Sequence, residues 1–147
     1  MAEQAGRDLP ELLSVQRAAG LDLLSDGLLG WQDIFRPLAE AAEGLDARPL
    51  TRFLDTNTFY RSVLVEGDPR LAAPLPARDL PAGEWVATLP SPLAFSRAAH
   101  DEVASEKLAA NVLAPQVEAW REAGAALIVL SEPFAAREGS SDEVVAH

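Results

Sequence analysis

The sequence predicts an α/β domain whose parallel strands are joined by helical crossovers. Two predicted helices each run through a glycine, Gly20 and Gly124, into a short apolar segment. Each apolar segment ends in a polar turn, residues 25–27 in the first case and residues 131–133 in the second. Helix, glycine, buried strand and polar turn follow one another in β/α units, whose strands pair in parallel through right-handed crossovers.

Composition and charge exclude several classes of protein. The chain has 147 residues, of which 48% are hydrophobic and 24% charged, the balance of one globular domain. A net charge of −11 repels phosphates and anionic lipid, so we expect neither a nucleic-acid nor a membrane partner. The absence of cysteine excludes disulfides and thiol catalysis and is consistent with a reducing cytoplasm. No signal-peptide pattern and no apolar run long enough to span a bilayer is seen, so we expect a cytoplasmic protein.

The first element is predicted to be a helix that begins near Asp8. This residue can cap the helix, Pro10 then falls in the first turn, and Glu11 lies at the capping-box position. Apolar residues recur at helical spacing up to Gly20, which is suited to ending the helix. Residues 21–24 then form a short strand candidate.

The middle of the chain is predicted to hold one helix, one strand and a connector. Residues 31–42 have an apolar helical face, but Pro37 is expected to interrupt the helix. Residues 49–65 are rich in β-branched and aromatic side chains, which favours a strand with a loop. Residues 66–83 contain four prolines and are predicted to be a connector within the domain.

The last third of the chain contains the clearest strand. Residues 84–92 are predicted to be a strand that ends in a Pro-Ser-Pro turn. A long helix from Ser105 to Gly124 should follow, kinked at Pro115. Residues 125–130 are an uninterrupted apolar run, and residues 140–147 have the pattern of a helix that is just beginning.

Ligands of parallel α/β sheets bind at the carboxyl ends of the strands. The segments predicted to lie there are residues 25–27, 55–61, 90–92 and 131–133.

Four segments in this order resemble a known enzyme family. They read GLDLLSDGLLGWQD, RFLDTNTFYRSV, VATLPSP and AGAALIVLSEP. Together they resemble the catalytic barrel domain of cobalamin-independent methionine synthase, in particular its short archaeal and bacterial forms, over about residues 12–138. The resemblance implies an eight-stranded β/α barrel that transfers a methyl group from a polyglutamylated methyl-folate to homocysteine. It also implies a zinc ion that holds the homocysteine thiolate.

The chain departs from the family at residues that carry this chemistry. The family binds zinc through one His, two Cys and one Glu, whereas this chain has no Cys and only His100 and His147. We therefore expect no zinc site and no other cofactor in this chain. Leu28 stands where the family has the Glu of Asp-Gly-Glu, and Ser131 replaces the Asp of Asp-Glu-Pro. Trp31 stands in place of an Arg.

The length predicts about half of a barrel. A β/α barrel takes roughly 200 residues or more, and only about four strands are predicted here. Residues 1–147 are therefore interpreted as a single partial TIM-type barrel that resembles the first half of the methionine synthase domain. Its open edges predict a complementary barrel half, self-association to a homo-oligomer, or a different closure.

Two functions from different classes follow from the sequence. By resemblance the chain is a methyltransferase of the 5-methyltetrahydropteroyltriglutamate–homocysteine type, which we do not expect to be active as an isolated chain. The alternatives are a non-catalytic half-barrel that acts as a binding or interaction module, and a truncated gene product. A homocysteine- or folate-like small molecule is the ligand that the resemblance implies.

Six residues are predicted to contact a ligand, and none is predicted to be catalytic or to bind a metal. They are Glu132, Ser131, Asp26, Asn57, Arg61 and Ser91. Four of them have a structural alternative. Glu132 can cap a helix or pair with Arg137 or another arginine, and Asp26 can shape its turn. Asn57 can form an Asx turn, and Arg61 can pair with one of many carboxylates.

Other polar and aromatic residues are assigned structural roles. Asp33 is expected to complement the dipole of a helix, while Tyr60 could line a pocket. His100 is expected in a solvated helix entry, with no second histidine nearby for a metal. The three tryptophans, Trp31, Trp85 and Trp120, are expected to anchor a core or an interface.

Overall fold

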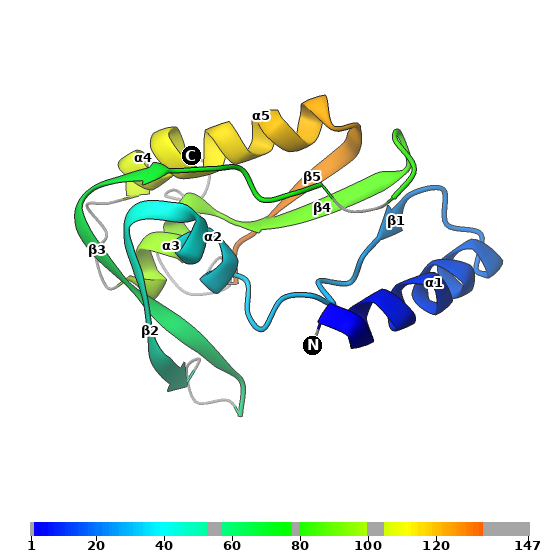
Figure 1. Cartoon of the computed structure of the whole chain (residues 1–147), viewed down its shortest axis with the longest axis horizontal. Coiled ribbons are helices and arrows are strands. Elements are labelled where there is room, and N and C mark those ends of the chain that lie inside the picture. Colours follow the sequence, from blue (N-terminus) through cyan, green and yellow to red (C-terminus); the bar gives the residue numbers. More distant parts are fainter. Residues whose placement is uncertain (1, 53–56, 78–79, 100–104, 134–147) are drawn as a thin grey trace.

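The computed structural model describes residues 2–52, 57–77, 80–99 and 105–133 (Figure 1). Its strands form two separate sheets, and the predicted parallel pairing is confirmed for three of them. β1 (Leu24–Ser25), β4 (Trp85–Pro90) and β5 (Ala125–Ser131) make an open parallel sheet in the order β1-β4-β5. β2 (Ala42–Arg52) and β3 (Phe59–Leu71) form an antiparallel pair.

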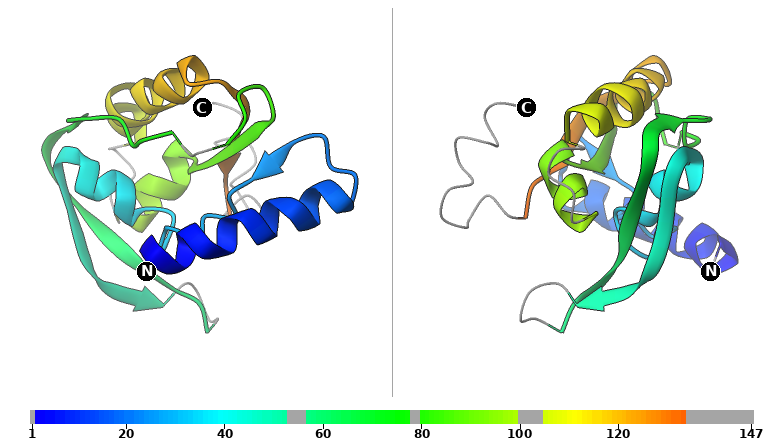
Figure 2. Two further views of the ribbon diagram at one scale, coloured as in Figure 1. Left: turned by 45° about the vertical axis from the view of Figure 1, so that its right-hand side comes forward. Right: turned by 90° about the vertical axis from the view of Figure 1, so that its left-hand side faces the viewer.

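The antiparallel pair corrects the prediction for the middle of the chain. The segment predicted as one strand and a loop supplies both arms of a hairpin, which extends beyond the rest of the molecule in both views of Figure 2. The register shifts twice along the hairpin, and the first shift coincides with Gly44. Gly44 has a φ of +76°, and a Cβ there would lie 2.9 Å from the carbonyl oxygen of Glu66. Only glycine therefore allows the backbones of the two strands to come this close. β3 continues to Leu71 and thus includes the first part of the predicted connector.

The first helix begins before its predicted cap. α1 spans Ala2–Ala18, so Asp8 and Pro10 lie inside it. The predicted stop is correct: Gly20 has a φ of +78° and its N–H donates to the carbonyl of Arg17. Gln16 then ties the helix to β1, because its side-chain amide donates to the Ser25 carbonyl at 2.8 Å and accepts from the Ser25 N–H at 2.9 Å.

Pro37 acts differently from the prediction, and Pro115 adjoins a local break in the α-helix. α2 spans Arg36–Ala41, with Pro37 in its first turn, where a missing N–H costs nothing. The long helix consists of α4 (Ser105–Leu108), a π-helical turn η2 (Ala109–Leu113) and α5 (Ala114–Glu122). The N–H of Ala114 bonds to the carbonyl of Ala109, five residues back, directly before Pro115. Because the proline ring would clash with the carbonyl four residues earlier, the wider turn accommodates it.

A short helix that the sequence analysis missed follows β4. α3 spans Pro92–Ala98 and begins where a Pro-Ser-Pro turn was predicted. Ser91 is its N-cap, since the hydroxyl accepts from the N–H of Ala94 at 3.0 Å, and Pro92 occupies the first turn. The predicted helix at residues 140–147 lies outside the described residues.

The core lies between the parallel sheet, the helices α2 to α5 and the start of the hairpin. One face of β4 contributes Trp85, Ala87 and Leu89, each at most 3% exposed. Trp85 packs edge-on against Trp120 of α5, with ring centroids 5.6 Å apart. The prediction that Trp85 and Trp120 are core anchors is therefore confirmed, and Trp31 packs against the same core.

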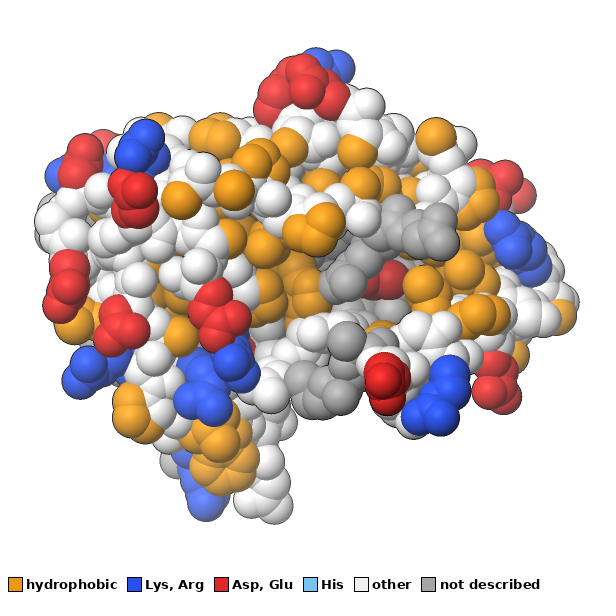
Figure 3. Space-filling view, viewed as in Figure 1, with side chains coloured by type: hydrophobic (Ala, Val, Ile, Leu, Met, Phe, Trp, Pro, Cys, Tyr) orange, Lys and Arg blue, Asp and Glu red, His pale blue; other side chains and the backbone are white. Residues whose placement is uncertain are grey.

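The outer strand β5 remains much less covered. The strand carries no charged residue and would be expected to be buried. Leu127, Val129 and Leu130 are nevertheless each 40–47% exposed. On the face seen in Figure 3, hydrophobic side chains gather across the middle, and most of the charged side chains lie away from them. No helix in the described part of the chain is both long and apolar enough to cross a membrane.

We predict that Gly124→Ala destabilises the protein by about 2–4 kcal/mol. Gly124 has a φ of +96°, and a Cβ there would lie 2.7 Å from the Cβ of Ala82, in the turn before β4. Gly67→Ala is the matched control, because Gly67 has a φ of +75° and open space around it. The control should lose only about 1 kcal/mol from backbone strain. Urea unfolding measures both, and equal losses would contradict the close contact.

Candidate functional site

The carboxyl ends of β4 and β5 meet at Ser91 and Glu132. The two strands pair in parallel up to Pro90 and Ser131, and the N–H of Ser91 then donates to the Ser131 carbonyl at 2.9 Å. This bond brings the residue after β4 alongside the residue after β5. The Ser91 hydroxyl donates to the carboxylate of Glu132. The structure therefore brings the side chains of two of the six predicted residues, Ser91 and Glu132, together, with the backbone carbonyl of Ser131 beside them.

Ser91 performs two tasks with one oxygen atom. Its hydroxyl accepts the N–H of Ala94, which caps α3, and donates its proton to Glu132. The side chain is only 8% exposed, so both bonds form away from bulk water. A charge-assisted bond in such a setting orients the carboxylate more firmly than a surface contact would. Arg137, the arginine named as an alternative partner of Glu132, lies outside the described residues.

Asp26 lies at the end of the neighbouring strand β1 and shapes its turn. Its Oδ1 accepts the N–H of Leu28 at 3.0 Å, and the side chain is 7% exposed. Leu28 has a φ of +54°, a left-handed conformation unusual for a leucine. These contacts favour the turn-forming alternative for Asp26. The carboxylate also borders a small cavity of about 10 Å³ beside Trp31 and Trp120, large enough for one water molecule.

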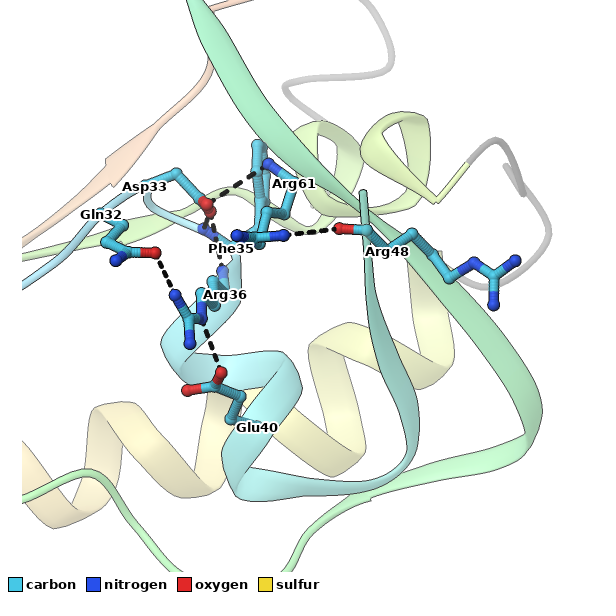
Figure 4. Close-up of polar contacts among 7 residues, drawn as sticks. All are labelled: Gln32, Asp33, Phe35, Arg36, Glu40, Arg48 and Arg61. Carbon is cyan, nitrogen blue, oxygen red and sulfur yellow. Dashed lines mark hydrogen bonds and ion pairs between the residues drawn. The ribbon is translucent and has the colours of Figure 1, made fainter. Parts of the chain in front are cut away.

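Asn57 and Arg61 come from the hairpin and not from the end of a parallel strand. Asn57 is exposed, and Arg61 lies within β3. The backbone N–H of Arg61 donates to Asp33, and its guanidinium donates to the carbonyl of Arg48 at 3.4 Å (Figure 4). The prediction that residues 55–61 lie at the carboxyl end of a parallel strand is wrong for residues 59–61, which belong to the antiparallel strand β3, and residues 55–56 lie outside the described part of the chain.

A groove that the sequence analysis did not foresee lies next to Ser131. Its volume is about 300 Å³, and three segments far apart in the chain line it: residues 32–35, residues 58–60, and Ser131 with Pro133. Asp33 fixes the first segment, since its Oδ1 accepts the N–H groups of Phe35 at 2.9 Å and Arg36 at 2.8 Å (Figure 4). The expected role of Asp33 at a helix start is consistent with these contacts at the beginning of α2. Of the residues that line the groove, the sequence had pointed to Tyr60 as a pocket residue and to Ser131 as a ligand contact.

Tyr60 forms part of the wall of this groove. Its ring meets Phe35 edge-on, with ring centroids 5.5 Å apart. Burial raises the pKa of the Tyr60 hydroxyl above its usual value of 10.0, because the charged phenolate would lose its hydration. The side chain is therefore neutral at physiological pH and acts as an aromatic surface with a hydroxyl group.

The described residues contain no group of three or more His, Cys, Asp or Glu side chains that could hold a metal ion. His100 and His147 lie outside the described residues. The pair formed by Ser91 and Glu132 offers one hydroxyl and one carboxylate. Such a set suits hydrogen bonding to an organic ligand, whereas zinc sites take three or four nitrogen, sulfur or carboxylate ligands.

Comparison with known proteins supports the resemblance at the level of the fold. No family model and no curated protein matches the sequence. Among solved structures, a B12-independent methionine synthase from Shewanella sp. W3-18-1, in complex with selenomethionine, matches with a TM-score of 0.64. The fold is similar to that of part of this methionine synthase.

The match to this methionine synthase is broad for the present chain and partial for the larger one. It covers 97% of this chain and 46% of the methionine synthase, at 20% sequence identity. The chain thus spans just under half the length of the protein it matches. The suspected resemblance is confirmed as a likeness of fold, and a mixed α/β fold with a parallel sheet corresponds to half of the longer chain.

We predict that Ser91 and Glu132 are energetically coupled. Ser91→Ala should destabilise the protein by about 1–2 kcal/mol, because α3 loses its cap and Glu132 loses a donor. Glu132→Ala in the Ser91→Ala background should cost less than it does alone, with a coupling energy of about 0.5–1.5 kcal/mol. A double-mutant cycle in urea measures this coupling. Strict additivity of the two substitutions would show that the side chains do not interact.

We predict a raised titration midpoint for Tyr60, the only tyrosine of the chain. Tyrosinate absorbance then reports this side chain alone, and its midpoint in the folded protein should exceed 10.0. Because the folded state favours the protonated phenol, its contribution to stability is complete below the unfolded pKa and is lost as the pH rises toward the folded pKa. The urea-unfolded protein is the control. A midpoint equal to that of the unfolded chain would show that the ring is solvated.

Proposed function

We propose that this chain is a partial barrel of the methionine synthase type that binds a homocysteine- or folate-like molecule at the carboxyl ends of β4 and β5. The observation that carries the proposal is the Glu132 carboxylate, which the buried Ser91 hydroxyl holds at the strand ends. Parallel α/β sheets bind their ligands at this edge. Carboxylate oxygens accept hydrogen bonds from ammonium and N–H groups, the polar groups that a homocysteine- or folate-like molecule carries.

We further propose that the isolated chain does not transfer a methyl group. A free thiol has a pKa near 8.5, so a thiol substrate is mostly protonated at neutral pH and needs activation. The zinc of the resembling enzymes supplies that activation when bound, by stabilising the thiolate. The residues of this chain do not fit such a site, because the sequence has no cysteine and the described residues hold no metal-binding group. Ser91, Ser131 and Glu132 bind and orient a ligand without activating a thiol.

The barrel is proposed to be completed by further β/α units, from a complementary chain or from a second copy. The match to less than half of a longer chain supports this proposal, as do the exposed apolar residues of β5. An uncovered apolar strand at a sheet edge favours pairing with another strand. Ligands for a zinc ion would then have to come from the added units. Without such units, the chain is a non-catalytic binding module.

The proposal predicts binding without turnover. The purified protein, supplied with zinc, should retain no stoichiometric metal by elemental analysis and should form no methionine from homocysteine and methyl-tetrahydropteroyltriglutamate. Calorimetric titration with homocysteine should still show binding. Glu132→Gln should weaken that binding about tenfold, because a charge-assisted bond is lost.

Glu11→Gln is the matched control, since Glu11 is an exposed carboxylate on α1 and its removal changes the net charge equally. The control should bind homocysteine like the unaltered protein. Methionine formation by the isolated chain would overturn the proposed lack of activity. Equal weakening of homocysteine binding by both substitutions, or no binding to the unaltered protein, would show that Glu132 does not contact the ligand.

A further inference from the structure

The groove beside Ser131 has the size and walls of a small-molecule site. Its volume of about 300 Å³ is at the lower end of the roughly 300–1,000 Å³ of ligand pockets. Phe35, Phe59 and Tyr60 give it three aromatic walls, and Ile34 and Pro133 add apolar surface. An aromatic ring held between such side chains gains both burial and favourable edge contacts.

Asp33 is the only charged side chain among the described residues that line the groove. Its Oδ1 accepts two backbone N–H groups and its Oδ2 accepts the N–H of Arg61 at 3.3 Å, so the carboxylate is held in place (Figure 4). Within the described part of the chain, no lysine or arginine forms an ion pair with it. These bonds come from neutral amides, so the negative charge is not cancelled and a lone pair can still accept from a ligand.

We propose that this groove binds a small aromatic ligand that bears a positively charged nitrogen, such as an aryl amidine or an arylalkyl amine. The aromatic walls would take the ring, and the Asp33 carboxylate would pair with the cation. Phe59 already attracts a cation, since the Arg52 guanidinium lies 5.5 Å from its ring centroid. The net charge of −11 adds a long-range attraction for cations. The inference uses Asp33 and the hairpin, and does not depend on Glu132 or on methyl transfer.

Benzamidine is a suitable probe, with benzoate as its anionic counterpart of the same shape. In an NMR titration of the ¹⁵N-labelled protein, benzamidine should bind saturably and shift the amides of residues 58–60. Benzoate should cause no saturable shift. Asp33→Asn should weaken benzamidine binding about tenfold, because the ion pair is lost while the amide oxygen can still accept from Phe35 and Arg36.

Two further variants separate the groove from general effects. Asp22→Asn removes the same charge from an exposed residue before β1 and should leave the affinity unchanged. Ser131→Leu should fill part of the groove and abolish binding, with the far-UV circular dichroism spectrum as a check of folding. Equal binding of benzamidine and benzoate, no binding of either, or equal weakening by Asp22→Asn and Asp33→Asn would overturn the proposal.

Discussion

The parallel pairing of β4 with β5 is the constraint on which the rest of the structure depends. From Val86 opposite Leu127 to Pro90 opposite Ser131, the two strands run in one register. Because parallel strands in register end at the same level, the residues that follow them are forced together, and Ser91 meets Glu132 there. At the other end, Gly83 donates its N–H to the Gly124 carbonyl at 2.9 Å, which fixes the starts of the strands. The position of the carboxylate thus follows from a backbone register.

The sequence was informative wherever a local pattern decides the structure. The apolar runs that became β4 and β5, the glycine stop at Gly20 and the polar turn after β5 were all predicted, because each depends on neighbouring residues alone. Serine followed by proline is also a local signal, since serine caps a helix and proline suits its first turn. That signal was present in Ser91 and Pro92 and could have identified α3 and the buried role of Ser91.

Features that depend on contacts between distant segments could not be predicted in the same way. The hairpin of β2 and β3 relies on Gly44 passing close to Glu66, more than twenty residues away, and its bulges obscure the alternation of a regular strand. The groove forms only where the segments that contain Asp33, Tyr60 and Ser131 meet. The local sequence of one segment does not predict its contact with the other two. Proline alone was also ambiguous: Pro37 starts a helix and Pro115 follows a π-turn, although both were expected to disrupt.

The central claim is that, within the described residues, the parallel sheet stops at β5 and presents an uncovered edge beside the Glu132 site. In a strand, alternate backbone N–H groups point to opposite sides, so only one set of β5 amides can bond to β4. Native-state hydrogen exchange of the whole chain, measured at a concentration where it is monomeric and read residue by residue, therefore tests the claim directly. The set that faces β4 should exchange slowly, and the alternate set should exchange at nearly the rate of unstructured peptide. Equal protection of both sets would show that the edge is covered and would contradict the account.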